Sequence, residues 1–144
     1  MKFLLLLLFI KTLVSYNPDA ATQYAHDHCD SDSYNPAYPK YDGHDCANFV
    51  SQCLIAGGLN LNGCVGVNSY GTVPAVSDLK SCLSALGWKS SSSRPQGFRD
   101  GYPMIYDSHA VLATYVDGST IKYSAHTNDR CDSGFYGSPI FYYL

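Results

Sequence analysis

The sequence predicts one domain that combines α-helices with an antiparallel β-hairpin. Three stretches have the spacing of apolar residues that is typical of helices, at 17–29, 45–58 and 74–87. Further along, two runs of strand-forming residues flank Asp117-Gly118, a dipeptide that favours a tight hairpin turn. The chain has 144 residues, which is the length of one domain.

The first fifteen residues predict a secretory signal peptide. They contain Lys2, an apolar run and the small residue Ser15. The run is too short to span a bilayer and Lys11 interrupts it, although an N-terminal anchor or a buried strand remains an alternative. We therefore expect residues 1–15 to be removed and residues 16–144 to form a secreted, extracellular domain.

Composition excludes several classes of partner. The net charge is −3, so the chain lacks the basic surface of a nucleic-acid-binding protein. No second apolar run predicts contact with a membrane after the signal peptide is removed. Six cysteines in a secreted chain predict disulfides. We expect the mature domain to be a monomer.

The first and last helices carry their own start and stop signals. Asn17 is a good N-cap for the first helix, and Pro18 fits its first turn. In the last helix, an apolar stripe is followed by Gly87, which favours a helix end. The stripe consists of Leu79, Cys82, Leu83 and Leu86.

The central helix has a cysteine at its first position. Asp45 is the expected N-cap, Cys46 begins the helix, and Gly57-Gly58 ends it. One face of the helix is apolar and the side away from it is polar. The apolar face carries Cys46, Phe49, Val50, Cys53 and Leu54, whereas Asn48, Ser51 and Gln52 face away.

The two cysteines of this helix are expected to differ in chemistry. The free N–H groups and the positive end of the helix dipole point at the Cys46 sulfur, which favours the thiolate. Cys53 lies two turns further on, roughly 10 Å away at 1.5 Å per residue, which is too far for a disulfide between the two. Because Cys53 lies in the apolar stripe, we expect it to pack as a small hydrophobic residue.

The hairpin predicts that two histidines lie opposite each other. A two-residue turn at Asp117-Gly118 pairs Val116 with Ser119, and the same register pairs His109 with His126. Cross-strand partners have Cβ atoms about 4.5–5.5 Å apart. Both imidazoles would then lie on one face of the sheet.

The residues between the histidines predict which face a helix covers. On the histidine face the neighbours are Val111 and Ala113, which are small enough for a helix to pack closely. The other face carries Leu112, Val116, Ile121 and Tyr123. The remaining histidines carry less information. His26 and His28 fit surface or packing roles, and His44 lies near Cys46 only by its place in the sequence.

These residues predict nucleophilic catalysis by a thiol. Cys46 would attack a carbonyl, His109 would take and return the proton, and His126 would hold the His109 ring in the right tautomer. Asn128 follows two residues later and would support the same site. A zinc site formed by the cysteine and the two histidines is the alternative, but the chain lacks a close-spaced ligand pair, so we expect neither a metal nor another cofactor.

Four segments resemble the putative amidase domain family, which belongs to the NlpC-type and CHAP-type papain-like cysteine hydrolases. They are "AATQYA", "NPAYPKYDGHDCANFVSQCLIAGGL", "SHAVLATYVDG" and "IKYSAHTND". The resemblance covers residues 16–129 and weakens between 60 and 100. It implies a papain-like α+β fold in which the cysteine helix packs on a central antiparallel sheet.

The same resemblance implies roles for single residues. Cys46 is the nucleophile, His109 the base and His126 the polar third member. In related families a tyrosine upstream of the cysteine often serves the active site. Tyr38 and Tyr41 are both candidates for this role.

Related families cleave amide bonds in bacterial cell-wall peptides. The function predicted here is therefore a secreted cysteine amidase or peptidase acting on peptidoglycan or on other peptide and amide substrates. A catalytically silent papain-like module that binds cell-wall material is the alternative. Hydrolysis and acyl transfer to another amine pass through the same acyl-enzyme, so both remain open.

The other cysteines are expected to form two disulfides. Cys46 must stay reduced to react and Cys53 faces the core, which leaves Cys29, Cys64, Cys82 and Cys131. Four cysteines allow three pairings. We favour Cys64 with Cys82, since they flank one loop-and-helix insertion, and Cys29 with Cys131, which would tie the first helix to the loop after the second strand.

Overall fold

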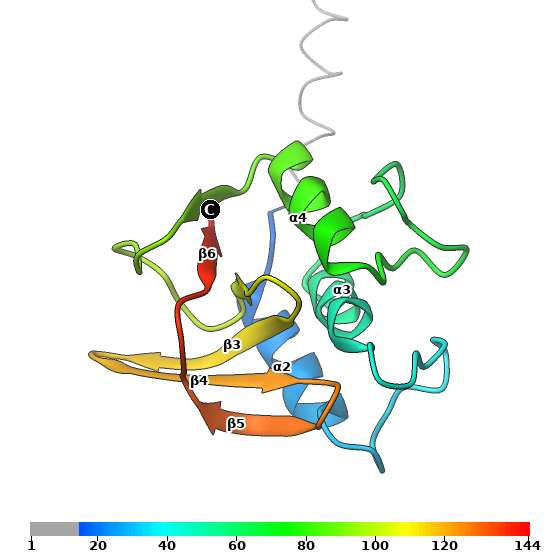
Figure 1. Cartoon of the computed structure of the whole chain (residues 1–144), viewed down its shortest axis with the longest axis horizontal. Helices are drawn as coiled ribbons and strands as arrows, with labels where there is room; N and C mark the ends of the chain where they lie inside the picture. Colours follow the sequence, from blue (N-terminus) through cyan, green and yellow to red (C-terminus); the bar gives the residue numbers. More distant parts are fainter. Residues whose placement is uncertain (1–14) are drawn as a thin grey trace, which may run out of the picture.

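The computed structural model describes residues 15–144 and has an α+β fold (Figure 1). Almost all of the predicted signal peptide lies outside the described residues. Within them the helices are α2 (Pro18–His28), α3 (Cys46–Ala56) and α4 (Val76–Ala85). All three were predicted, and Asn17 caps α2 by accepting the N–H of Ala20.

The strands form one six-stranded antiparallel sheet in the order β1-β6-β2-β3-β4-β5. The last strand of the chain, β6, is inserted between β1 and β2, so it lies inside the sheet rather than at its edge. The strands are β1 (Lys89–Ser91), β2 (Pro103–Ile105), β3 (Ala110–Asp117), β4 (Thr120–Ala125), β5 (Arg130–Gly134) and β6 (Ile140–Tyr143).

Helices α2 and α3 pack on one face of the sheet, beside the ends of β3 and β4 (Figure 1). On this face Leu112 joins a buried cluster with Ala25 of α2 and Phe49 of α3. Val111 and Ala113 lie in a different cluster, on the opposite face. The predicted assignment of the faces is therefore wrong.

The register of the predicted hairpin is also wrong. Asp117 pairs with Thr120, which leaves Gly118 and Ser119 as the turn residues. Gly118 has a φ of +53°, and a turn with glycine first fits the type II′ geometry of hairpins. An irregularity between Ala113 and Tyr115 then shifts the pairing by one residue. As a result, His109 and His126 do not pair across the strands.

Helix α3 is buried on all sides rather than on one face. Asn48, Ser51 and Gln52, which were predicted to face away from the core, are all buried. Their polar atoms are satisfied inside the protein. The Ser51 hydroxyl accepts the N–H of Val73, for example, and the Gln52 side chain accepts the hydroxyl of Tyr24. The sequence prediction failed because α2 and the segment before α4 cover the polar side of the helix.

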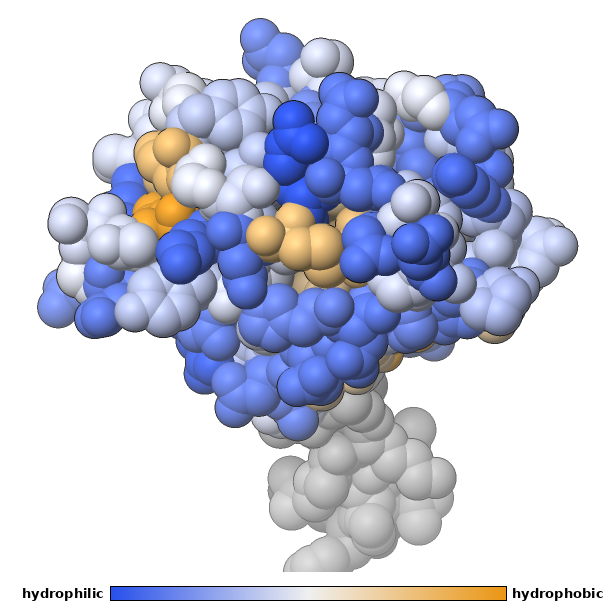
Figure 2. Space-filling model, turned by 90° about the horizontal axis from the view of Figure 1, so that it is seen from below, coloured by the Kyte–Doolittle hydropathy of each residue, from blue (hydrophilic) through white to orange (hydrophobic). Residues whose placement is uncertain are grey.

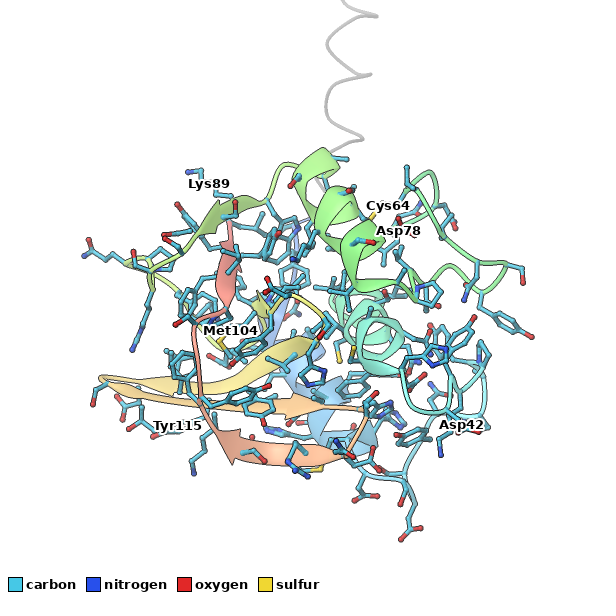
Figure 3. All side chains as sticks on the ribbon, viewed as in Figure 1. Asp42, Cys64, Asp78, Lys89, Met104 and Tyr115 are labelled. Carbon is cyan, nitrogen blue, oxygen red and sulfur yellow. A yellow bond between two sulfur atoms is a disulfide. The ribbon has the colours of Figure 1, made fainter. Side chains whose placement is uncertain are left out.

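Two disulfides brace the fold. Cys29–Cys131 joins the end of α2 to β5, and Cys64–Cys82 joins a loop to α4. Figure 3 shows Cys64 lying against α4, next to Asp78. This is the pairing that the sequence favours, and each bond contributes roughly 3–5 kcal/mol by restricting the unfolded chain. Cys46 and Cys53 are free thiols and both are buried.

The outer surface is mainly polar where Figure 2 shows it, with hydrophobic side chains in small separate spots. The large hydrophobic residues that are exposed include Val65, Tyr70 and Tyr136, which lie in different parts of the chain. None of the helices within residues 15–144 has the length and the apolar composition that a membrane-spanning segment requires.

Candidate active site

Cys46 and His109 line the same hollow, which has a volume of about 360 Å³. Cys46 reaches it from the start of α3, and only 4% of its surface is exposed. His109 reaches it from the loop that joins β2 to β3. The exposed side chain of His44 lines the same hollow. Two residues predicted for catalysis are thus brought together by parts of the chain that are sixty residues apart.

The thiol of Cys46 is less acidic than the helix position alone predicts. Burial raises the pKa of the thiol, and the negative charge of Asp45 adds to this effect. Backbone groups at Ala110, Ala47 and Cys46 itself act in the other direction, as expected at a helix start. Desolvation is the larger effect, so the resting group is a thiol and its reaction requires a base.

His109 has the properties that such a base requires. Its ring is half-buried, and burial lowers the pKa of the imidazole below its usual 6.5. The ring is therefore neutral near pH 7 and able to accept a proton. Its backbone is held as well, because the carbonyl oxygen of His109 accepts the N–H of Tyr106 at 2.7 Å and closes the loop.

His126 lies in the core rather than in the hollow. Only 1% of its surface is exposed, and its ring is stacked between Tyr34 and Phe49, with centroid distances of 3.8 and 3.9 Å. Its Nδ1 lies 2.5 Å from Oδ2 of Asp45, and its Nε2 lies 2.7 Å from the carbonyl oxygen of His28. Both ring nitrogens are engaged by these partners, so the expected contact between His126 and the His109 ring is absent.

Asp45 connects the start of α3 at Cys46 to this buried histidine. Its carboxylate accepts the N–H of Tyr41 and the side-chain amide of Asn48, each at 2.9 Å, in addition to the His126 ring. Its own backbone N–H donates to the hydroxyl of Thr127 at 2.9 Å. Asp45 is the N-cap residue of α3, as predicted, but its side chain makes no capping bond to the helix. Instead it joins the helix start to the segment after β4.

Thr127 is a residue of the site that the sequence analysis missed. It lines the hollow together with Cys46 and His109. Its φ is +65° and that of Asn128 is +58°, a region that non-glycine residues seldom occupy and that is least favourable for a β-branched residue. Asn128, a predicted support residue, lines a neighbouring hollow with His109. No sequence pattern marks a backbone of this kind.

The structure distinguishes the two candidate tyrosines. Tyr41 lines the hollow that contains Cys46, and its hydroxyl accepts the side-chain amide of Asn68 at 3.0 Å. Tyr38 lines a different hollow, next to Gln52 and His126. Only Tyr41 therefore lies beside the thiol.

Comparisons with known proteins give a family match over part of the chain. The model of the putative amidase domain family matches residues 15–102. This segment includes Cys46 and α3 but ends before His109 and His126. Neither the curated proteins nor the solved structures contain a match. Within the described part of the chain, no group of three or more His, Cys, Asp or Glu side chains is arranged to hold a metal ion.

Proposed function

The chain belongs to the putative amidase domain family, and on this premise we propose that it is a secreted cysteine amidase that hydrolyses amide bonds. The observation that carries the proposal is that the Cys46 thiol and the His109 ring line one hollow. A thiol beside a neutral imidazole is the minimal apparatus for acyl transfer. A papain-like fold with the cysteine helix against the sheet is part of the same proposal.

The reaction proceeds in two steps. As the Cys46 sulfur attacks the carbonyl carbon, its proton passes to His109, and the backbone N–H of Cys46 at the helix start stabilises the oxyanion. His109 then protonates the leaving amine, the C–N bond breaks and a thioester remains. Water, deprotonated by His109, hydrolyses the thioester and restores the thiol.

His126 and Asp45 serve as positioning residues in this mechanism. Asp45 directly precedes the nucleophile, and His126 holds the carboxylate of Asp45 in place. Their effect on His109 is therefore indirect. Asn128 and Thr127 lie nearer to it, and we assign them the support of the His109 ring, since each shares a hollow with that side chain.

We assign the substrate to the amide bonds of bacterial cell-wall peptides. Two features support this assignment. The sequence resembles the NlpC-type and CHAP-type hydrolases, and the N-terminal pattern together with two disulfides fits an extracellular enzyme. Tyr41 and the loop around Gly43 form the wall of the hollow against which such a peptide would lie.

Incubation with purified cell-wall fragments in H₂¹⁸O, followed by mass spectrometry, tests this function. Hydrolysis places ¹⁸O in the new carboxyl group, whereas transfer to another amine does not. Cys46→Ala and His109→Ala should each abolish turnover and keep the fold, and His126→Ala should reduce turnover less. Cys53→Ala is the matched control, because this thiol is buried in mid-helix and away from the hollow.

Alkylation by iodoacetamide at neutral pH separates an enzyme from a silent binding module. In the enzyme, His109 assists the Cys46 thiol, which should react well ahead of Cys53 in the folded protein and lose this advantage in His109→Ala. Substantial turnover by Cys46→Ala would refute the assignment of the nucleophile. Equal and slow alkylation of both thiols would favour the binding module.

A further inference from the structure

A second hollow lies next to His109, and Cys46 is not part of its lining. It has a volume of about 340 Å³, at the lower end of the range for small-ligand sites. It shares His109 and Thr127 with the hollow that contains Cys46, so the two adjoin along these residues. Its lining consists of His109, Tyr123, Thr127, Asn128, Arg130 and Tyr136.

Arg130 gives this hollow a fixed positive charge. Its Nη1 donates to the carbonyl oxygens of Asn128 and Asp129, at 2.7 and 3.2 Å, which holds the guanidinium beside the hollow. Among residues 15–144, Arg130 makes no ion pair, and its other N–H groups make no hydrogen bond with the protein. These groups are free to meet a ligand, and a guanidinium matches the geometry of a carboxylate.

A third hollow, which adjoins the Arg130 hollow along Thr127 and Asn128, has the opposite charge. It is lined by Asp42, Asp45 and Asp129, together with Lys40, which pairs with Asp42. Figure 3 shows Asp42 in the loop before α3. A negatively charged group would therefore be placed in the Arg130 hollow rather than in the acidic one.

Two tyrosines, Tyr123 and Tyr136, form part of the wall of the Arg130 hollow. The rings of Tyr106 and Tyr136 are stacked at 4.7 Å and nearly parallel, and the Tyr106 hydroxyl donates to the carbonyl oxygen of Tyr136. Burial raises the pKa of the Tyr136 phenol, and the charge of Arg130 opposes this effect. Tyr136 and Arg130 line the same hollow.

We propose that Arg130 binds a carboxylate on the leaving group, so that the enzyme releases an amino acid or short peptide with a free carboxyl end. This inference rests on the proposed function, because His109 protonates the leaving amine and the leaving group must lie on its side. In this step the Cys46 sulfur bonds to the acyl carbon, the C–N bond breaks, and the thiol proton travels through His109 to the amine nitrogen. The carboxylate is unchanged throughout.

Two matched pools of N-acetyl dipeptides test the proposal. Both carry every L- and D-residue at the first position and alanine at the second, one pool as free acids and the other as carboxamides. The wild type should cleave the acid pool with a kcat/KM about 10- to 100-fold higher. Arg130→Met should lower kcat/KM for the acid pool by about the same factor and affect the amide pool much less, because a carboxamide oxygen accepts a weaker hydrogen bond than a carboxylate. Arg130→Lys should fall between the two, because lysine keeps the charge and loses the fork.

Two controls separate the failure of this inference from that of the proposed function. Arg94→Met removes an equally exposed charge near the turn at Gly118 and should leave the ratio of the two pools unchanged. Iodoacetamide is neutral, so Arg130→Met should still be alkylated at Cys46 at the wild-type rate. If the wild type cleaves both pools equally, the carboxylate site alone is overturned. The same holds if it cleaves neither pool while Cys46 is alkylated rapidly. Slow alkylation of Cys46 in the wild type overturns the proposed function.

Discussion

His126 holds the carboxylate of Asp45, the residue before Cys46, through a contact of 2.5 Å. The pair is buried, with 1% of the His126 side chain and 4% of the Asp45 side chain exposed. The carbonyl oxygen of His28 only accepts hydrogen bonds, so Nε2 of His126 must carry a proton. This places the end of α2, the start of α3 and the end of β4 in one hydrogen-bonded network.

A double-mutant cycle should show that Asp45 and His126 act as a unit. Asp45→Asn and His126→Asn should each lower the free energy of unfolding by about 3–5 kcal/mol, because each leaves a buried polar partner without its bond. The double variant should lose about 2 kcal/mol less than the sum of the two. Urea unfolding measures these values.

A surface histidine provides the control for this cycle. His26 lies 3.0 Å from Asp132, but both side chains are more than a third exposed. Because solvent screens that pair, His26→Asn should change stability by less than about 1 kcal/mol. Strict additivity of the Asp45 and His126 variants would contradict the proposed coupling.

The local signals in the sequence predicted the helices well because each depends on neighbouring residues. Asn17 with Pro18 fixes the start of α2, and Gly57-Gly58 fixes the end of α3. The hairpin was also found, but its register was not. The choice of Gly118 as first turn residue and the irregularity after Ala113 depend on packing across the sheet. The short strands β1, β2 and β6 gave no pattern to detect.

The site was predicted in part for the same reason. Cys46 is identified by its place at a helix start, and His109 by its place before a strand. The direction of His126 is set by Tyr34, Phe49 and Asp45, which all lie far from His126 in the sequence. No periodicity in the sequence specifies such an environment. The pairing of the histidines was a reasonable expectation from the hairpin alone, and the shifted register removed it.

The pH dependence of kcat/KM should be unusually broad. Burial lowers the pKa of His109 from 6.5 and raises that of the Cys46 thiol from 9.0. A neutral His109 is needed to take the thiol proton, so activity is lost only as the pH falls through a value below 6.5. The thiol loses its proton, which His109 passes to the leaving amine, only above pH 9.0. The rate should therefore be constant across the interval between these values.

Measurement of kcat/KM from pH 4 to 10 on one acid-pool peptide tests this expectation. The pH range of the assay is chosen to cover both limbs. An acid limb centred above 6.5 would mean that His109 is stabilised as a cation, which the buried ring does not support. Asn128→Ala should lower the plateau and leave the position of the acid limb unchanged, since an amide does not titrate.

The two disulfides should differ in their contribution to stability. Cys29–Cys131 closes a loop with a sequence separation of 102 residues and Cys64–Cys82 one of 18. The loop-entropy relation gives about 4.7 kcal/mol for the longer loop and about 3 kcal/mol for the shorter one. Replacing each pair by alanine should therefore lower the unfolding free energy more for Cys29 and Cys131.

The same comparison probes the site. Cys29 follows His28, whose carbonyl oxygen accepts a hydrogen bond from Nε2 of His126. Loss of the Cys29–Cys131 bond should therefore reduce turnover as well as stability, whereas loss of Cys64–Cys82 should reduce stability alone. Equal turnover in the two disulfide variants, measured at a temperature where both are folded, would contradict this link.

Thr127 offers the most direct test of the strained segment behind His109. Its hydroxyl accepts the buried N–H of Asp45, while its β-branched side chain occupies a backbone conformation with φ of +65°. Thr127→Ser keeps the acceptor and relieves the branching, so it should leave stability unchanged or raise it slightly. Thr127→Ala removes the acceptor and should cost about 1–3 kcal/mol, because the N–H of Asp45 is then unpaired. Thr127→Gly also removes the acceptor but relaxes the backbone. Its free energy of unfolding should therefore lie between those of the serine and alanine variants. Urea unfolding gives the order of the three, and an alanine variant as stable as the serine variant would show that the Thr127 hydroxyl does not hold the start of α3.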